Sequence, residues 1–579
     1  MAPAGYNAAV WQGISFSMNI LGIGGYSHDS AAVLVCDGRL VAGVAEERLT
    51  RVKHQGGVPR KAVRYCLDAA GLTPDDVDHI GVYMRPFLRM ARRLPYRLGK
   101  MVRSPIYSAG FMAYELAHNA QYIWGMLSLC GKRTKLHFLE HHPAHAAGAF
   151  LVSPFDEAAL LSVDYIGEWA ATWAGVGQGT SLGRLRATNY PNSLGVFYSA
   201  ITDYLGFLRA SDEYKVMGLA SYGEPEYYDE FRKIIRPRPD GWYDIDLSWL
   251  VCHYLPGSIK GYFSPKFLNR FGPPRKKGEP IEPRHRNIAA SAQRVLEETV
   301  LGIASWLHQR TGLRRLCMAG GVALNCALNG RLLRESPFDE IFIQPGAGDD
   351  GIAVGAAFQL HHRLTGAGRS FVMRDARIGP AYSNEEIRAF LDGANISYET
   401  PQAVEERAAE LIAEGKIVGW FQERMEFGPR ALGARSILAD PTRAEMKDLL
   451  NKHVKHREDF RPFAPSCLEE HAHEYFTGCD SSPFMLFVYP VKPEMREKVP
   501  AITHVDGTAR VQTVSDAVNP RYCRLIRAFE RRRGVPMVLN TSFNVMGEPI
   551  VNTPAEAVRC FYGTGMDAFV IGDYVVMKR

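Results

Sequence analysis

The stretch MNILGIGGYSHDSAAVLVCDGRLVAGVAEE, residues 18–47, decides the fold of the N-terminal part of this chain. It holds three apolar runs, at residues 19–25, 31–36 and 40–45, and the pair Asp37-Gly38 separates the second run from the third. Asp-Gly between two β-rich runs is a strong hairpin signal, because both central turn positions need a positive φ. The stretch therefore predicts a strand followed by a tight hairpin.

A second stretch repeats this plan later in the chain. Residues 158–167 form an apolar run that ends in acidic and glycine residues, and residues 171–177 form the next run. A unit of strand, turn and strand therefore occurs twice. Two such units are expected of a duplicated phosphate-gripping ATPase fold of the actin and sugar-kinase type.

The middle of the chain has an α/β pattern. Residues 61–70 and 287–311 carry apolar side chains at helical spacing. A strand ending in Gly320-Gly321, a helix from about Asn325 and a strand over 340–344 then follow one another. In α/β folds ligands bind at the carboxyl ends of the strands, so these turns are candidate binding positions.

The length of 579 residues is too great for one hydrophobic core. Periodicity lapses over residues 366–382, so we expect one α/β domain over 18–365, a linker over 366–382 and a second α/β domain over 383–579. A net charge of +6 favours anionic small molecules without demanding nucleic acid.

The N-terminal sequence and the cysteines indicate a cytoplasmic enzyme. Residues 1–17 have no basic segment followed by an apolar one, so no secretion signal is predicted, and either Met1 or Met18 could be the natural start. The ten cysteines form no C-x-x-C pair and are interpreted as reduced thiols. The longest uncharged stretch near the middle of the first domain, residues 116–130, falls short of the roughly 20 apolar residues of a membrane-spanning helix.

The stretch EHHPAHAAGAF, residues 140–150, is the strongest candidate for a metal site. His141 and His145 would share one face of a helix. Pro143 favours a first helical turn, however, so His141 could lie just before the helix, and the pair His142 and His145 stays an alternative. Asp164 ends an apolar strand, and Asp349 lies in a Gly-rich loop.

Two histidines and one or two aspartates suit a divalent ion with open positions for substrate oxygens. Fe²⁺ is the first expectation, with Mn²⁺ and Zn²⁺ as alternatives. A hydrogen-bonded cap or core histidine is the alternative interpretation of the cluster.

Two further groups near these strands could handle substrate. Gly320, Gly321 and Asn325 offer backbone amides and a helix N-terminus to a phosphate or nucleotide, although a glycine pair also serves tight packing. His28 is a candidate general base for an attacking hydroxyl, and Lys53 could stabilise developing negative charge. Surface turns are the alternative interpretation of both.

The second domain supplies cations beside loop-forming residues. Fixed cations with neutral donors suit a polyphosphate and carbamoyl phosphate, because guanidinium groups bind oxygens bidentately. Ordinary surface arginines are the alternative. The candidate residues are Arg430, Lys455, Arg461, Arg510, Asn540 and Ser542.

Residues 85–103 carry seven basic side chains and no acidic one. The preferred interpretation is a solvated basic helix over a site entrance, and binding of an anionic substrate or a membrane surface is the alternative.

Ten motifs run in an order that resembles the NodU/CmcH family of O-carbamoyltransferases, from about Met18 to the C-terminus. In the N-terminal part they are GYSHDSAAV (25–33), AEERLTRVKH (45–54), HHPAHA (141–146), VDYIGEW (163–169), KVMGLA (215–220), GGVALN (320–325) and GDDG (348–351). In the C-terminal part they are GPRALGARS (428–436), RPFAPS (461–466) and NTSFNVMGEPI (540–550).

The resemblance implies a fold and a reaction. The first domain is then a duplicated actin-like ATPase fold, as in the tRNA threonylcarbamoyl-transferase, and the second is YrdC-like. The second domain uses carbamoyl phosphate and ATP with Mg²⁺ and yields phosphate, pyrophosphate and carbamoyladenylate. The metal-bearing first domain then transfers the carbamoyl group to a hydroxyl of a small molecule, such as a secondary metabolite or modified sugar, and releases AMP.

The resemblance also implies roles for individual residues. It favours His141 over His142 as a metal ligand beside His145, Asp164 and Asp349. His28 and Lys53 resemble transfer-site residues. The implied cofactor-binding residues are Lys215, Gly320, Gly321, Asn325, Arg430, Lys455, Arg461, Arg510, Asn540 and Ser542.

One departure and three rival functions accompany the resemblance. Tyr165 follows the strand Asp where the family often has Gly, so the pocket beside the metal is expected to be narrower. A hydrogenase-maturation carbamoyltransferase is disfavoured by the lack of C-x-x-C pairs. A tRNA-modification component is favoured only by the basic segment, and no nucleic-acid partner is expected. A non-catalytic nucleotide-sensing scaffold is the third rival, and a homodimer is left open.

Overall fold

The structure, a computed structural model, describes residues 16–100, 105–251 and 262–578 and divides into two compact units. One consists of Ile20–Ser27 and Val77–Val372, and the other of Met1–Asn19, His28–Asp76 and Met373–Arg579. The expectations for residues 1–15, for Cys252 and for the end of the basic segment at 101–103 lie outside the described residues. The domain boundaries at residues 365 and 383 stay a prediction.

The first sheet has the strand order β3-β2-β1-β4-β5. Strands β1, β4 and β5 run parallel to one another, whereas β2 and β3 pair with each other in antiparallel fashion. The predicted hairpin is confirmed, because Asp37 and Gly38 take φ values of 47° and 76° in the turn. The strands are β1 (Asn19–Gly24), β2 (Ala31–Cys36), β3 (Arg39–Ala45), β4 (His79–Val82) and β5 (Lys135–Phe138).

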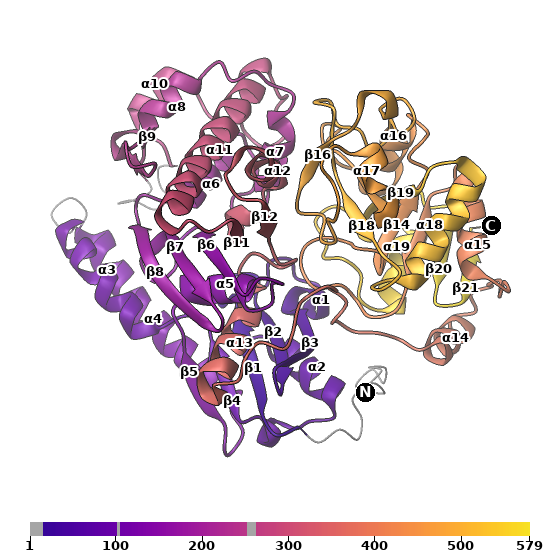
Figure 1. Cartoon of the computed structure of the whole chain (residues 1–579), viewed down its shortest axis with the longest axis horizontal. Coiled ribbons are helices and arrows are strands. Elements are labelled where there is room, and N and C mark those ends of the chain that lie inside the picture. Colours follow the sequence, from indigo (N-terminus) through magenta and orange to yellow (C-terminus); the bar gives the residue numbers. More distant parts are fainter. Residues whose placement is uncertain (1–15, 101–104, 252–261, 579) are drawn as a thin grey trace. The chain divides into compact units, whose positions relative to one another are not determined.

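The second sheet repeats this order as β12-β11-β6-β7-β8. Strands β6, β7 and β8 form an antiparallel meander, and β11 and β12 run parallel to β6. Both sheets therefore place a parallel pair on one side of their first strand and a hairpin on the other, which confirms the predicted repeat (Figure 1). The strands are β6 (Glu157–Val163), β7 (Ala170–Gln178), β8 (Ser181–Asn189), β11 (Arg315–Ala319) and β12 (Glu340–Phe342).

The helices predicted in this part of the chain are present with small changes of bounds. Residues 61–70 belong to α2, residues 287–311 belong to α11, and Asn325 is the N-cap of α12. The helices before residue 370 are α1 (Glu46–Thr50), α2 (Arg60–Ala70), α3 (Pro86–Lys100), α4 (Pro105–Leu127), α5 (His141–Phe150), α6 (Leu194–Tyr204), α7 (Glu213–Ala220), α8 (Tyr228–Ile234), α10 (Pro265–Phe271), α11 (Pro283–Thr311), α12 (Cys326–Glu335) and α13 (Ile352–Thr365).

Short elements complete this part. They are the 3-10 turns η2 (Pro74–Asp76), η3 (Leu247–Trp249) and η4 (Gly321–Leu324), and the hairpin strands β9 (Ile235–Pro237) and β10 (Tyr243–Ile245).

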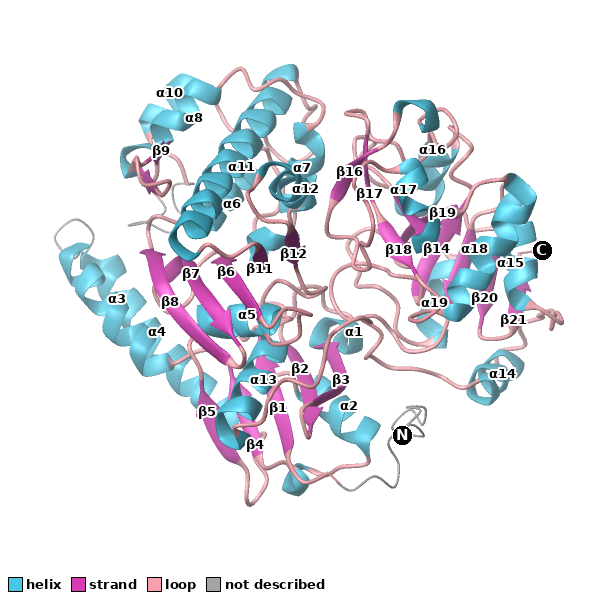
Figure 2. Cartoon of the chain, viewed as in Figure 1, coloured by secondary structure: helices cyan, strands magenta, loops and turns pink. Residues whose placement is uncertain are grey.

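The C-terminal sheet is mixed, with the order β18-β15-β19-β14-β13-β20-β21. Helices α15 and α18 pack side by side against it (Figure 2). This region is α/β as predicted, and its YrdC-like identity stays a prediction. The strands are β13 (Val418–Phe421), β14 (Arg435–Ala439), β15 (Ala464–Leu468), β18 (Gln512–Val514), β19 (Met537–Ser542), β20 (Ala568–Ile571) and β21 (Tyr574–Met577).

Helices and short elements surround this sheet. They are α14 (Asn384–Gly393), α15 (Val404–Ala413), α16 (Met446–Leu450), the π-helical turn η5 (Asn451–Lys455), η6 (Glu469–His471), α17 (Ala472–Tyr475), η7 (Pro493–Met495), α18 (Pro520–Arg533), α19 (Pro554–Tyr562), and strands β16 (Val488–Pro490) and β17 (Thr508–Arg510). Within the described ranges, we find no helix with the length and apolarity needed to cross a membrane.

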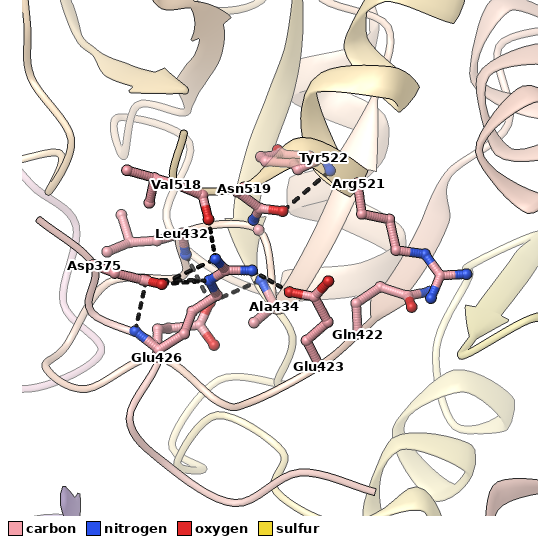
Figure 3. A network of polar contacts seen from close by, with 12 residues as sticks. Asp375, Gln422, Glu423, Glu426, Leu432, Ala434, Val518, Asn519, Arg521 and Tyr522 are labelled. Atoms are coloured by element: carbon pink, nitrogen blue, oxygen red, sulfur yellow. Dashed lines mark hydrogen bonds and ion pairs between the residues drawn. The ribbon is translucent and has the colours of Figure 1, made fainter. Parts of the chain in front are cut away.

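Part of the segment expected to be a linker is fixed to the C-terminal sheet. The guanidinium of Arg377 forms ion pairs with Asp375, at 2.9 Å, and with Glu423. It also donates to the carbonyl of Val518. Figure 3 shows Asp375, Glu423 and Val518 around this group. These polar contacts pack residues 373–382 against the rest of their unit.

A close helix contact fixes α5, the helix that carries the candidate metal histidines. Helices α5 and α13 pack together, with α5 against β6 and β11 and α13 against β4. A Cβ atom on Gly355 would lie 1.8 Å from the carbonyl oxygen of Ala144 and 2.5 Å from the amide nitrogen of Gly148. Only glycine therefore allows this approach.

We predict that Gly355→Ala lowers the free energy of unfolding by at least about 2 kcal/mol, because the methyl group forces α5 and α13 apart. Urea unfolding followed by circular dichroism measures the change. Gly368→Ala is the control, since its Cβ would meet no atom within 4 Å. Equal stability of the two variants would contradict the close packing.

Candidate active site

Four buried side chains converge from three parts of one unit. His141 and His145 lie on α5, Asp164 follows β6, and Asp349 lies in the loop before α13. Their relative exposures are 3%, 1%, 7% and 9%. Two carboxylates and two imidazoles are costly to bury unless they neutralise one another or bind an ion.

The distances between these groups fit one metal ion. His141 Nε2 lies 2.8 Å from Asp164 Oδ2 and 3.8 Å from Asp349 Oδ1. His145 Nε2 lies 3.5 Å and 3.3 Å from the same two oxygens. Ligand atoms that each lie about 2.1 Å from one ion are at most about 4.2 Å apart. All four measured distances satisfy this limit.

The geometry favours His141 over His142. Helix α5 begins at His141, so the expectation that Pro143 would leave His141 outside the helix is wrong. A proline within the first turn has no intrahelical hydrogen bond to lose. The ring of His142 instead contacts Ser162 Oγ and the carbonyl of Ala170, each at 2.9 Å. Burial lowers the pKa of His142 to about 3, so His142 is a neutral core residue.

His145 lies at the centre of the candidate metal site. Burial lowers its pKa, but the carboxylates of Asp164 and Asp349 outweigh burial and raise the pKa to about 9. Among the described residues, no group forms a hydrogen bond of good geometry with either ring nitrogen of His145. A buried imidazole that faces two carboxylates without such a bond fits a divalent ion.

The predicted nucleotide turn joins this cluster. The amide of Gly321 donates to Asp164 Oδ1 at 2.8 Å. Gly320 has a φ of 89°, and a Cβ there would lie 2.3 Å from the carbonyl oxygen of Val163. The glycine pair therefore lets the β11 turn approach the end of β6 and orient a candidate metal ligand.

The other two predicted nucleotide residues have structural partners of their own. The side chain of Asn325 accepts from the amide of Leu328 at 3.0 Å and donates to Gln293 Oε1 at 2.9 Å. Lys215, on α7, is buried and lies 3.1 Å from Asp212. Their contacts to a nucleotide stay predictions.

His28 and Lys53 lie in the other unit, where His28 belongs to a histidine–aspartate–histidine array and Lys53 precedes the second histidine, His54. Asp29 accepts from His28 Nδ1 at 3.0 Å through one oxygen and pairs with His54 Nδ1 at 2.7 Å through the other. The amide of His54 donates to Glu47 Oε2 at 2.9 Å. The sequence did not single out Asp29, Glu47 or His54 as site residues, and Glu47 and His54 lie 18 and 25 residues after Asp29.

The array has a defined charge distribution. Burial alone would raise the pKa of Asp29, but hydrogen bonds from His28 and His54 hold it well below its usual range. Burial likewise opposes the charge on His54, yet Asp29 raises its pKa above the ordinary value. The His54–Asp29 pair therefore stabilises the fold below the unfolded histidine pKa, and this stabilisation is lost as the pH rises through the folded pKa.

We predict that the pKa of His54 falls in Asp29→Asn, because burial is then opposed by Glu47 without the hydrogen bond and charge of Asp29. Titration of the imidazole signals by NMR measures the shift. Asp229→Asn, at an exposed helix position, serves as the control and leaves the titration unchanged. An unaltered His54 pKa in Asp29→Asn would contradict the array.

Lys455 is held in a socket of the C-terminal region. Its Nζ lies 3.0 Å from both the carbonyl and the Oδ1 of Asn544, and it also donates to the carbonyl of Ser542. Ser542 Oγ lies 2.7 Å from Asn544 Oδ1. Burial lowers the pKa of Lys455 well below its usual range, and the charges of Arg457 and Arg461 act in the same direction. Lys455, Ser542 and Arg461 are thus brought together, with Asn544 as a residue that the sequence missed.

Asn540 ties the remaining loops to the sheet. Its Nδ2 donates to Ser466 Oγ at 2.9 Å, to the carbonyl of Ala431 at 3.1 Å and to Gln512 Oε1 at 3.2 Å. These contacts join β19 to the loop of Arg430 and, across β15, to β18, the strand that follows Arg510. Asn540 is therefore a scaffold for the predicted cations, and the direct ligand contact predicted for it is untested.

Two arginines that follow β3 donate hydrogen bonds to backbone carbonyls of the C-terminal loops. Arg51 donates to the carbonyls of Pro549 and Ile550, at 2.7 Å and 2.6 Å. Arg48 donates to the carbonyl of Gly428 at 3.0 Å. These contacts span hundreds of residues of sequence, so no local pattern could have indicated them.

We predict that the purified protein binds about one divalent ion per chain, and that His145→Ala loses most of this metal because only three ligands remain. Elemental analysis by mass spectrometry after dialysis counts the ions. The exposed His473→Ala is the control and keeps the wild-type content. Equal metal content in His145→Ala would disprove the assignment of this ligand.

Comparisons with known proteins show the family of this chain. The family model described as Carbamoyltransferase N-terminus matches residues 19–358, and the one described as Carbamoyltransferase C-terminus matches residues 409–578. The chain belongs to the carbamoyltransferase family and is an enzyme of that class. The resemblance expected from the ten motifs is confirmed.

Relatives at high identity cover almost the whole chain. An uncharacterized protein of Synechocystis sp. is 43% identical, over 97% of this chain and 97% of its own length. The nodulation protein NolNO of Sinorhizobium fredii is 40% identical, over 96% of this chain and 79% of its own length. Component A of (R)-2-hydroxyglutaryl-CoA dehydratase from Acidaminococcus fermentans is structurally similar at a TM-score of 0.34 and 15% identity, covering 60% of this chain and 99% of that one.

Proposed function

We propose that this carbamoyltransferase is ATP-dependent: it forms carbamoyladenylate from carbamoyl phosphate and ATP, then transfers the carbamoyl group to a hydroxyl of a small molecule. The acceptor is a secondary metabolite or a modified sugar. The observation that carries the proposal is the buried cluster of two histidines and two aspartates, with one aspartate bonded to the glycine turn that suits a nucleotide phosphate.

The activation step belongs to the C-terminal cations. Water converts carbamoyl phosphate to carbamate and phosphate, and a carbamate oxygen then attacks the α-phosphorus of Mg²⁺-bound ATP and expels pyrophosphate. Arg430, Arg461 and Arg510 bind the phosphate oxygens of both substrates, since guanidinium groups suit them geometrically. An arriving anion favours the charged form of Lys455, which burial disfavours in the protein alone.

The transfer step uses further residues that the sequence singled out. Asp29 orients the His28 ring through Nδ1, and Nε2 of His28 accepts the proton of the acceptor hydroxyl. Lys53 stabilises the negative charge that develops as the hydroxyl attacks the carbamoyl carbon. The helix N-terminus after Asn325 binds the departing AMP, because the amides of Gly320 and Gly321 already donate to the carbonyl of Ala347 and to Asp164.

The metal has one role in this scheme. Held by His141, His145, Asp164 and Asp349, a divalent ion, with Fe²⁺ as the first choice, would supply Lewis-acid polarisation of the carbamoyl carbonyl. The protein residues exclude water from the cluster, which is buried on all four ligands.

We predict that single substitutions separate the two steps. Arg461→Ala reduces carbamoyl-phosphate-dependent pyrophosphate release by about 100-fold, because a charged contact to a phosphate oxygen is lost. His145→Ala retains pyrophosphate release and loses transfer. A coupled pyrophosphate assay follows the first step, and mass spectrometry of a panel of hydroxylated metabolites follows the gain of one CONH group.

Matched lysines provide the control. Lys455→Met reduces pyrophosphate release, whereas Lys452→Met, at an exposed position in the same helical turn, leaves it at the wild-type rate. Normal carbamoylation by both Arg461→Ala and His145→Ala would rule out the proposed division of labour.

A further inference from the structure

Helix α3 carries much of the basic segment that the proposed reaction leaves without a role. Two of its arginines are buried: Arg89 and Arg93 each lie 3.0 Å from Glu115 Oε1 on α4. Their side chains are 9% and 12% exposed. The interpretation of α3 as a solvated basic helix is therefore wrong for these two residues.

One buried carboxylate joins the start of α3 to the start of α5. Glu168, only 3% exposed, accepts from the amide of Arg85 at 3.0 Å. It also accepts from the amide of His141, at 3.1 Å and 3.2 Å from its two oxygens. Arg85 precedes the first residue of α3, and His141 is the first residue of α5. Glu168 thus satisfies the N-terminal amides of two helices at once.

Arg93 fixes the backbone around Glu168. Its Nε donates to the carbonyl of Glu168 at 2.9 Å, and a second nitrogen donates to the carbonyl of Gly167 at 2.8 Å. Gly167 in turn packs on His141, because a Cβ there would lie 3.0 Å from the Cβ and the Cδ2 of that histidine. Arg93 and His141 therefore hold the same segment from two sides.

Aromatic contacts extend this link along α3. The ring of Trp169 lies 5.2 Å from that of Tyr96 on α3 and 5.7 Å from that of Tyr190. The amide of Tyr190 donates to the carbonyl of Trp169 at 2.8 Å. The segment from Asp164 to Trp169 thus runs directly from a candidate metal ligand to the face of α3.

We propose that Glu168 and Arg93 are positioning residues for the metal centre, and that α3 is part of the architecture of the transfer site. This inference rests on the metal site of the proposed function. Glu168 sets the first turn of α5 and so the direction of the His141 ring, while Arg93 holds Glu168 and Gly167 in place. Groups that orient metal ligands tune affinity as strongly as some ligands do.

The test measures metal binding directly. Wild-type protein stripped of metal is titrated with Co²⁺, whose visible absorption reports both affinity and coordination geometry. Glu168→Gln and Arg93→Lys are expected to weaken Co²⁺ binding by about 10-fold to 100-fold and to change the spectrum. Arg93→Lys keeps the charge of α3 and loses the paired donation to two carbonyls, so it isolates positioning from electrostatics.

Controls separate this inference from the proposed function. Arg92→Lys is the matched control, since Arg92 lies on the same helix and contacts Glu140 at 3.8 Å. It is expected to bind Co²⁺ as the wild type does. Pyrophosphate release is expected to persist in all three variants.

Each outcome decides the inference. Failure of the wild type itself to bind Co²⁺ would overturn the metal site and this inference together. Wild-type affinity and spectrum in both Glu168→Gln and Arg93→Lys, with reduced thermal stability alone, would reduce these residues to a purely structural role and overturn only this inference. Should Glu168→Gln fail to fold, Arg93→Lys alone decides.

Discussion

The cost of burying Asp164 and Asp349 is the constraint on which the site depends. A carboxylate removed from water is stable only with a compensating charge or with several donors. Here His141 and His145 face both carboxylates, and the amide of Gly321 donates to the other oxygen of Asp164, Oδ1. This arrangement holds the four side chains in place without an ion. The binding of a metal ion would therefore need little rearrangement.

The repeated sheet explains why these residues meet. Strand β6 is the central strand of the second sheet and ends just before Asp164, and its parallel neighbour β11 ends just before the glycine turn. The carboxyl ends of parallel strands share one edge, so a candidate metal ligand and a candidate phosphate-binding turn become neighbours. Helix α5 packs against both strands and adds the histidines. The fold therefore makes the juxtaposition, and the close contact of α5 with α13 fixes it.

Local signals in the sequence predicted much of this and missed what depends on distant partners. Asp37-Gly38 specified the hairpin because positive φ is a property of two adjacent residues. The choice between His141 and His142 as a metal ligand depended on the residue at which α5 begins. A shift of the helix start by one residue would reverse this choice. Glu168 and Arg93 were not predicted because their partners lie far away in sequence, and Asp29 was not predicted because one of its two partners, His54, lies 25 residues away. Glu115 is likewise distant in sequence from Arg89 and Arg93, and its carboxylate accepts hydrogen bonds from both guanidinium groups away from the surface.

The proposed site has four side chains that bind one ion. X-ray diffraction tests the position of this ion most directly. Crystals soaked with Mn²⁺ and recorded near its absorption edge would locate the ion by its anomalous signal. The account predicts one strong peak about 2.2 Å from Nε2 of His141 and His145 and from an oxygen of Asp164 and Asp349. The absence of a peak there, with the four side chains ordered as described, would contradict it.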